Sequence, residues 1–338
     1  MAKAHAVTQA ESPRFARHGG RLDDARSHYP DAPTPWLDLS TGINPRPWVP
    51  ASFDFDSGPL PEMSSLRRLE RAAAAFFGCA PEQVAAVPGS EVALRLLPFI
   101  GLPRPLVAAS PTYGTHREVA EHAVSHAALA EQADSGGTLL LANPNNPDGL
   151  LRTHDELLAL AARASAASGA VVIDEAFADV DPSISIVPHL RKAANVTVLR
   201  SFGKFFGLAG VRLGFVVGNA TVIDRMRALL GDWPVSTQAI IWSTAGYSDA
   251  AWITKTRTWL RAQAARLDAL LAAHGLQAGG ACPLFRLVEH PGAWDIFDLL
   301  ARAGILTRPF DAQPNWLRFG LPADDAAFDR LDRALARG

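Results

Sequence analysis

Lysine is scarce in this chain of 338 residues: arginine supplies 28 of the 32 basic residues. The four lysines are Lys3, Lys192, Lys204 and Lys255. Codon usage is the simplest explanation of the count itself. The consequence is chemical, since a reaction that needs a primary amine can occur at few places in this protein.

Cysteines, net charge and long apolar runs are also lacking. Cys79 and Cys282 are too few for a disulfide framework or a cysteine-based zinc site, so we expect two reduced thiols and no metal. The formal net charge of -2 gives no electrostatic footprint for nucleic acid or for an anionic membrane. The most apolar stretch, Val92–Ala109, contains Arg95, Arg104 and three prolines, so we expect no membrane span. No apolar segment resembling a secretory signal follows the first residue, and we therefore expect a cytoplasmic protein.

The hydrophobic fraction of 48% allows a large core, and the length suggests about two domains. Residues 1–45 are rich in Pro, Gly, Asp and aromatics with little periodicity, which predicts an N-terminal arm with turns. A change of pattern near residue 235 predicts a large domain over residues 46–235. Residues 236–338 are then expected to form a smaller α+β domain, which includes a long amphipathic helix from about 251 to 274.

Short apolar runs without alternation predict strands that are buried on both faces. These runs are Val84–Val87, Leu106–Ala109, Thr138–Ala142, Ala170–Asp174, Val196–Arg200 and Leu213–Val217. Helical patterns lie between several of them, and one begins at a capping box of Thr153 and Glu156. The alternation predicts an α/β fold with a mostly parallel sheet and helices on both faces. Ligands bind beyond the carboxyl ends of such strands.

The segment S-F-G-K-F-F-G-L-A-G-V-R, residues 201–212, follows one of these strands. A lysine is usually a solvated surface residue, but three phenylalanines flank Lys204. An apolar setting disfavours the ammonium form, and a lysine must react as the neutral amine to form a Schiff base. Ser201 and Arg212 add a hydroxyl and a guanidinium that suit an anionic group such as phosphate.

Four other loops after predicted strands carry polar or aromatic residues with two interpretations each. Asp174 lies at the end of an apolar strand. It is either a structural residue, as a helix cap or ion-pair partner, or the counter-ion of a buried cationic ring nitrogen. Asn146 lies in N-P-N-N-P-D-G, which is a tight turn or an amide presented to a ligand. The turn at Gly89 either connects a strand to a helix or binds phosphate through its amides. Tyr113 is a packing residue or an aromatic ring beside a ligand.

In this order, the segments resemble the aspartate-aminotransferase-like enzymes of fold type I, which use pyridoxal 5'-phosphate (PLP). The resemblance covers nearly the whole chain. It implies that Lys204 holds PLP through a Schiff base and that Asp174 pairs with the pyridine nitrogen. Asn146 would hydrogen-bond the ring oxygen, and Tyr113 would stack on the ring. The cofactor phosphate would be held by groups of Gly89, Ser90, Glu91, Ser201 and Arg212. The family also implies a small-molecule substrate and a homodimer.

Features outside the cofactor motifs narrow the expected reaction. H-G-G at 18–20 and L-D-L-S-T-G-I-N-P at 37–45 resemble the threonine-phosphate decarboxylases of cobalamin biosynthesis. Phe177 stands where most aminotransferases of this fold have a tyrosine, and Leu60 stands where related enzymes often have another. The resemblance implies decarboxylation of L-threonine O-3-phosphate. The alternative is an aminotransferase for a phosphorylated amine such as histidinol phosphate.

Two more distant alternatives are a PLP-binding regulator and a catalytically inactive homologue. A regulator of transcription needs a DNA-binding segment ahead of the fold, for which the short arm leaves no room. An inactive homologue is disfavoured because Lys204, Asp174 and Asn146 are all present.

A phosphorylated substrate needs cationic groups of its own. Our candidates for the substrate phosphate are His18 and Arg152, and Asn44 is a candidate for the carboxylate. Arg318, in W-L-R-F-G, matches the family's arginine that binds the substrate α-carboxylate through a bidentate pair. Each has an ordinary alternative, namely a surface imidazole for His18, a solvated helix-start residue for Arg152 and a surface ion pair for Arg318.

Overall fold

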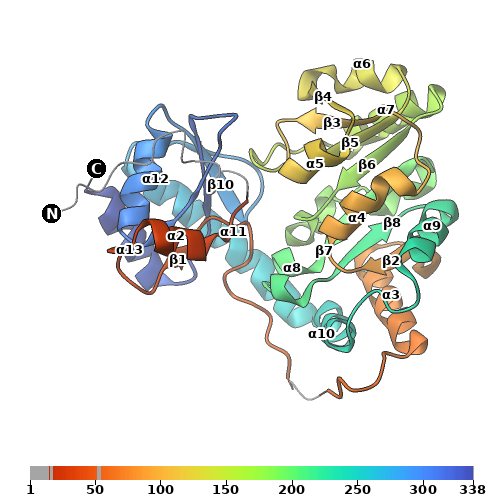
Figure 1. Ribbon diagram of the computed structural model, residues 1–338, viewed down its shortest axis with the longest axis horizontal. Helices are drawn as coiled ribbons and strands as arrows, with labels where there is room; N and C mark the ends of the chain where they lie inside the picture. Colours follow the sequence, from red (N-terminus) through yellow and green to blue (C-terminus); the bar gives the residue numbers. More distant parts are fainter. Residues whose placement is uncertain (1–14, 16–17, 52–54, 338) are drawn as a thin grey trace. The chain divides into compact units, whose positions relative to one another are not determined.

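The computed structural model describes residue 15 and residues 18–51 and 55–337 (Figure 1). These residues form two compact units. The larger one comprises residues 47–146 and 150–257, and the smaller one comprises the described residues up to Arg46, residues 147–149 and those from Thr258 onward. Within the described ranges, no helix combines the length and apolar composition needed to cross a membrane.

A seven-stranded sheet forms the centre of the larger unit, in the order β2-β8-β7-β6-β5-β3-β4 (Figure 1). The strands share one direction except β8, which is antiparallel to both of its neighbours. All six predicted strands are present. The one that was not predicted, β4, is a largely exposed edge strand without an apolar run. The bounds are β2 (Val84–Val87), β3 (Leu106–Ser110), β4 (His122–Ser125), β5 (Thr138–Ala142), β6 (Ala170–Asp174), β7 (Val196–Ser201) and β8 (Gly214–Val217).

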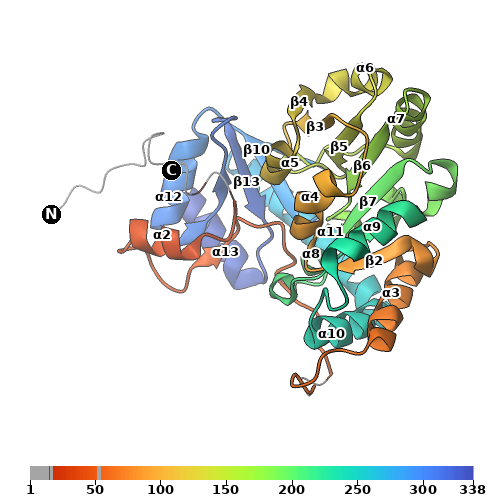
Figure 2. The ribbon, with the colours of Figure 1, turned by 45° about the vertical axis from the view of Figure 1, so that its right-hand side comes forward.

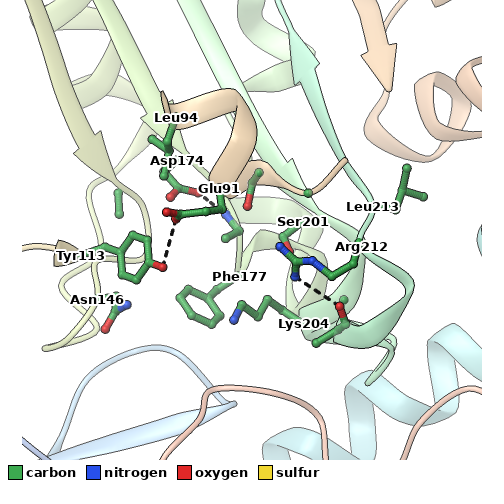
Figure 3. Close-up of a pocket in the computed structure, with 16 residues that line it drawn as sticks. Glu91, Leu94, Tyr113, Asn146, Asp174, Phe177, Ser201, Lys204, Arg212 and Leu213 are labelled. Atoms are coloured by element: carbon green, nitrogen blue, oxygen red, sulfur yellow. Dashed lines mark hydrogen bonds between the residues drawn. The ribbon is translucent and has the colours of Figure 1, made fainter. Parts of the chain in front are cut away.

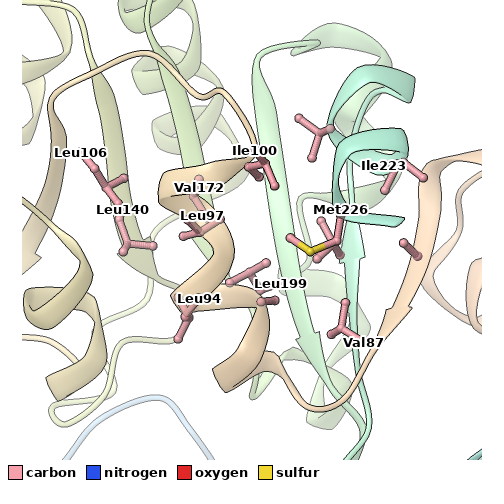
Figure 4. Packing of buried hydrophobic residues seen from close by; sticks show 14 residues of the cluster. Val87, Leu94, Leu97, Ile100, Leu106, Leu140, Val172, Leu199, Ile223 and Met226 are labelled. Carbon is pink, nitrogen blue, oxygen red and sulfur yellow. The ribbon is translucent and has the colours of Figure 1, made fainter. Parts of the chain in front are cut away.

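Helices cover both faces of this sheet, as predicted. On one face α4 and α9 pack an aliphatic cluster over the strands (Figure 4). Val216 of β8 belongs to this cluster, whereas the next side chain, Phe215, points to the opposite face. There the Phe215 ring contacts Phe77 of α3 and Tyr247 of α10 at centroid distances of 5.5 and 5.8 Å. The helices of this unit are α3 (Met63–Phe77), α4 (Ser90–Leu96), α5 (Gly114–Val119), α6 (Leu129–Asp134), α7 (His154–Ala166), α8 (Phe202–Phe205), α9 (Ala220–Leu230) and α10 (Thr237–Ser248).

The start of α7 follows the sequence prediction. The hydroxyl of Thr153 accepts a hydrogen bond from the amide of Glu156 at 3.2 Å, and the Glu156 carboxylate accepts one from the Thr153 amide at 2.7 Å. Two amides at the helix start are thereby satisfied by side chains, which fixes where α7 begins. This helix leads into β6, which carries Asp174.

The division into units differs from the sequence-based boundary near residue 235, because α10 packs on the larger sheet. Its Tyr247 is buried among aromatic rings of α3, α8 and β8. The sequence did not predict α10, because its apolar residues are spread around the helix instead of forming one stripe. The contacts therefore divide the chain within α11 (Ala250–Ala273), between residues 257 and 258.

The smaller unit contains a four-stranded antiparallel sheet in the order β12-β13-β10-β9, with β13 and β10 side by side (Figure 2). Strand β1 (Leu37–Asp38) lies outside this sheet and pairs in parallel with β11 (Ile305–Leu306). The predicted arm is thus tied to the C-terminal part by strand pairing. The remaining elements are α2 (Leu22–His28), β9 (Ala278–Gly279), β10 (Phe285–Glu289), α12 (Ala293–Arg302), β12 (Arg308–Pro309), β13 (Trp316–Gly320) and α13 (Asp325–Leu335).

Candidate active site

A pocket in the larger unit opens at the edge of the sheet where the parallel strands end (Figure 3). Arg212 reaches the same edge because it precedes β8, whose antiparallel direction places its first residue there. The ends of β2, β3, β5, β6 and β7 and the segments that follow them, including the start of α4 and α8, supply the other lining residues. All nine residues predicted to contact the cofactor line this pocket, namely Gly89, Ser90, Glu91, Tyr113, Asn146, Asp174, Ser201, Lys204 and Arg212.

Lys204 lies on α8, directly after the central strand β7. The phenylalanines beside it, Phe202, Phe205 and Phe206, are fully buried in the core, and none of them lines the pocket. The Lys204 ammonium nitrogen lies 5.9 Å from the centroid of the Phe177 ring, which also lines the pocket. The amine is therefore carried by a short helix whose other side chains are packed into the core.

Asp174 has two identified hydrogen-bond donors in the larger unit. Its Oδ1 accepts from the amide of Ala176 at 3.0 Å, and its Oδ2 lies 3.1 Å from Nε2 of the fully buried His116. Because an ionised carboxylate can only accept, Nε2 of His116 is the donor in this contact, and Nδ1 of the same ring lies 2.9 Å from the Thr112 hydroxyl. His116 was not predicted as a site residue, since nothing in the sequence distinguishes it from the other nine histidines.

Glu91 lines the pocket, but its carboxylate is occupied by other side chains. Tyr113 donates to Oε2 at 3.1 Å, Thr115 donates at 3.0 Å, and Arg95 donates at 2.9 Å. Burial, followed by the charge of Glu91, raises the pKa of Tyr113 to about 12. A carboxylate repels a phosphate, so only the backbone amide of Glu91, and not its side chain, is suited to bind the cofactor phosphate. The side chain instead links α4 to the Tyr113 ring.

The corner around Gly89 and Arg212 has the chemistry of an anion site. Gly89 has a φ of +89°, and a side chain there would place its Cβ 2.9 Å from the guanidinium of Arg212. Arg212 itself is in the left-handed region with a φ of +56°, which is uncommon for a residue with a side chain. The hydroxyl-bearing residues Ser90 and Ser201 line the same pocket.

The candidate substrate residues fall into both units. Arg152 belongs to the larger unit, where Asn143 binds both polar groups of its backbone at 2.8 and 3.2 Å. Its guanidinium lies 3.2 Å from Nδ1 of His126. The backbone of Arg152 is thus fixed by Asn143 after β5, and its guanidinium contacts His126 after β4.

The other three candidates, His18, Asn44 and Arg318, belong to the smaller unit. Ser40 connects two of their segments, because Arg318 donates to its carbonyl at 2.8 Å and the amide of Gly20 donates to its hydroxyl at 2.7 Å. Asn44 and Arg318 are each only 2% exposed. The two arm segments singled out in the sequence are therefore brought together with the W-L-R-F-G strand within this unit.

Comparison with known proteins adds two kinds of similarity. The family model "Aminotransferase class I and II" matches residues 58–335. A threonine-phosphate decarboxylase from Sinorhizobium sp is 41% identical, over 95% of this chain and 97% of that protein. One from Pseudomonas aeruginosa is 40% identical, over 94% and 96%. A histidinol-phosphate aminotransferase from Bradyrhizobium diazoefficiens is 31% identical, over 72% and 74%.

Solved structures resemble the fold at lower identity. A histidinol-phosphate aminotransferase from Clostridium acetobutylicum superposes with a TM-score of 0.78 at 20% identity, over 88% of this chain and 98% of that one. One from Sinorhizobium meliloti, in complex with pyridoxal-5'-phosphate, gives 0.72 at 21% identity, over 83% of each chain. At such identity these two structures show the fold alone, and it agrees with the predicted α/β class. Because the family model matches most of this chain, the chain belongs to the aminotransferase class I and II family.

Proposed function

We propose that this protein is a PLP-dependent decarboxylase. It converts L-threonine O-3-phosphate into (R)-1-amino-2-propanol O-2-phosphate and CO2 in cobalamin biosynthesis. Two relatives of about 40% identity over nearly the whole chain carry the name threonine-phosphate decarboxylase, which supports this reaction over transamination. The observation that carries the cofactor is the single pocket lined by all nine predicted residues, Lys204 and Asp174 among them.

The residues of the pocket fit PLP at its phosphate end. Arg212 offers a permanent positive charge, and the hydroxyls of Ser90 and Ser201 offer neutral donors. Gly89 leaves room for an anion to approach the backbone, since a Cβ there would lie against the guanidinium. One guanidinium together with several neutral hydrogen-bond donors is a suitable set of ligands for a phosphate ester.

The remaining residues fit the ring end. Asp174, oriented by His116, can accept a hydrogen bond from a protonated ring nitrogen and keep it protonated. Asn146 and Tyr113 line the same pocket, and we assign them to the ring oxygen and to the ring face. Lys204 supplies the amine that holds the cofactor covalently. When bound, PLP withdraws electrons from the substrate α-carbon, which makes loss of CO2 possible.

Four residues are proposed for the substrate. Arg318 and Asn44, which both belong to the smaller unit, take the α-carboxylate, and His18 and Arg152 take the substrate phosphate. The support for Arg152 is that its backbone and guanidinium are both fixed by neighbouring side chains. An arginine that is fixed in advance loses less entropy when it binds a phosphate.

The reaction is tested by incubating the PLP-loaded protein with L-threonine O-3-phosphate and 2-oxoglutarate. Release of CO2 without formation of glutamate is the expected result. Formation of glutamate without CO2 would replace the proposal with an aminotransferase. Histidinol phosphate is the amine to test in that case, because a histidinol-phosphate aminotransferase is 31% identical over most of the chain.

We also propose that the protein is a cytoplasmic homodimer. The family resemblance supports the dimer, and exposed apolar side chains such as Leu60 and Ile241 are available for such a contact. Light scattering during size exclusion tests the dimer, and a mass of one chain of 36.1 kDa would contradict it. Fractionation of cells that express the protein tests the location.

A further inference from the structure

A cluster of buried charges lies behind the pocket, and the chemistry proposed above does not use it. Arg200 at the end of β7 donates to Glu175 at 2.6 Å and to Ser185 at 2.9 Å, and it also pairs with Asp179. Glu175 accepts two more hydrogen bonds, from the Ser185 hydroxyl and the Ile186 amide, each at 2.6 Å. The three charged residues are at most 2% exposed, and none of them lines the pocket.

The position of the cluster follows from the alternation of side chains along the strands. Asp174 and Glu175 are consecutive at the end of β6, and Arg200 and Ser201 are consecutive at the end of the neighbouring strand β7. Consecutive side chains point to opposite faces. Asp174 and Ser201 line the pocket, while Glu175 and Arg200 pair behind it.

The cluster also fixes the two segments that lead away from these strands. Glu175 and Asp179 bracket Phe177, whose ring centroid lies 5.9 Å from the lysine amine, so Arg200 binds that segment on both sides. Arg200 in turn precedes Lys204 by four residues on β7 and α8. The guanidinium also lies 4.5 Å from the centroid of the Phe77 ring of α3, which limits its movement.

Stability alone does not account for such a cluster. Removing charges from water is costly, and apolar residues of similar volume are often equally stable or more stable. Burial raises the pKa of both Glu175 and Asp179, which reflects this cost. A buried ion pair does hold its two segments in one defined arrangement. A site that binds a cofactor covalently needs its side chains in such a defined arrangement.

We propose that Arg200, through Glu175 and Asp179, is a positioning residue that sets Asp174 and Phe177 against Ser201 and Lys204. The inference rests on the proposed binding of PLP in this pocket. It predicts that weakening the cluster alters how the cofactor is held, beyond any general loss of stability.

The test compares Glu175→Gln with Glu70→Gln. Glu70 is a matched control, because it is also buried, pairs with Arg67 and Arg227, and does not line the pocket. Three quantities are measured: the dissociation constant of PLP, the visible circular dichroism at saturating PLP, and the melting temperature without PLP. We expect Glu175→Gln to weaken PLP binding by about tenfold and to change the dichroism, because coupled buried contacts reach about 1.4 kcal/mol. Glu70→Gln is expected to lower only the melting temperature.

Arg200→Lys provides a second measurement if Glu175→Gln does not fold. A lysine keeps the charge but lacks the fork that spans two carboxylates, so we expect a smaller change of the same kind. Wild-type PLP affinity and dichroism in both variants would overturn the positioning role. A change in affinity that merely follows the melting temperature in all three variants would overturn it as well. If the wild-type protein does not bind PLP, the proposed function fails first, and the inference fails with it.

Discussion

Nε2 of His116 lies 3.1 Å from Oδ2 of Asp174, and both side chains are buried beside the pocket. The two residues come from different segments, one from α5 and one from the end of β6. The contact fixes the direction of the carboxylate before any ligand arrives. In the proposed PLP site, this is the direction from which Asp174 would face the ring nitrogen.

Replacing His116 with Phe tests this orientation, because Phe keeps a ring of similar size and removes both nitrogens. A hydrogen bond to a charged group contributes about 1.5 kcal/mol, so we expect PLP to bind about tenfold more weakly. The measurement is a fluorescence titration of the apoprotein with PLP. His122→Phe, at an exposed histidine on β4, is the control, and equal affinities in the two variants would contradict the role of His116.

The hydrogen bond between Tyr113 and Glu91 predicts a titration shift. Tyr113 has a pKa of about 12, raised by burial and by Glu91, so its tyrosinate absorption appears at higher pH than that of a free tyrosine. An unfolded chain loses this proton near pH 10, so the tyrosine makes the folded state less stable as pH rises from about 10 towards 12. Glu91→Gln removes the charge and lowers the pKa of Tyr113. Tyr113→Phe identifies the signal by its loss, and an unchanged titration in Glu91→Gln would show that the carboxylate has no effect.

Arg152→Ala separates substrate binding from cofactor binding. We expect KM for L-threonine O-3-phosphate to rise at least about tenfold, since a charge-assisted hydrogen bond contributes about 1.5 kcal/mol or more. The affinity for PLP is expected to stay at the wild-type value. Arg163→Ala, at an exposed arginine of α7, controls for the loss of a positive charge. A wild-type KM in Arg152→Ala would remove this residue from the proposed phosphate site.

Thr153→Ala tests the start of α7 independently of function. Loss of the capping hydroxyl is expected to lower the free energy of unfolding by about 1 kcal/mol. Urea denaturation followed by far-ultraviolet circular dichroism gives this value. Ser165→Ala, at an exposed position within the same helix, is expected to leave it nearly unchanged. A loss of the same size in both variants would argue against the cap.

The strands of the larger sheet were predictable because strands buried on both faces are continuous apolar runs. β5 and β6 have the predicted bounds. The misses have physical causes: β4 is an exposed edge strand, and the apolar residues of α10 are spread around the helix instead of forming one stripe. The pairing of β1 with β11 joins segments more than 250 residues apart, and local patterns carry no information about such pairs.

Part of the candidate site was predictable for a topological reason. Loops that follow parallel strands meet at one edge, so unusual residues in those loops converge, as Asn146, Asp174 and Lys204 do. The contacts of His116 and the hydrogen bonds of Glu91 could not be predicted, because they depend on the orientation of individual side chains. The buried ion pair of Glu175 and Arg200 could not be predicted either, since no local sequence pattern indicates that these two residues contact each other.

In the proposed function, the reaction depends on the amine of Lys204. Lys204→Arg keeps a positive charge on a long side chain, but a guanidinium does not replace the amine in the covalent bond to PLP. The decisive measurement is the rate of CO2 release from L-threonine O-3-phosphate by this variant in saturating PLP. We expect the release to fall by several orders of magnitude, with loss of the visible absorption band of the covalently held cofactor. Release at the wild-type rate would contradict it.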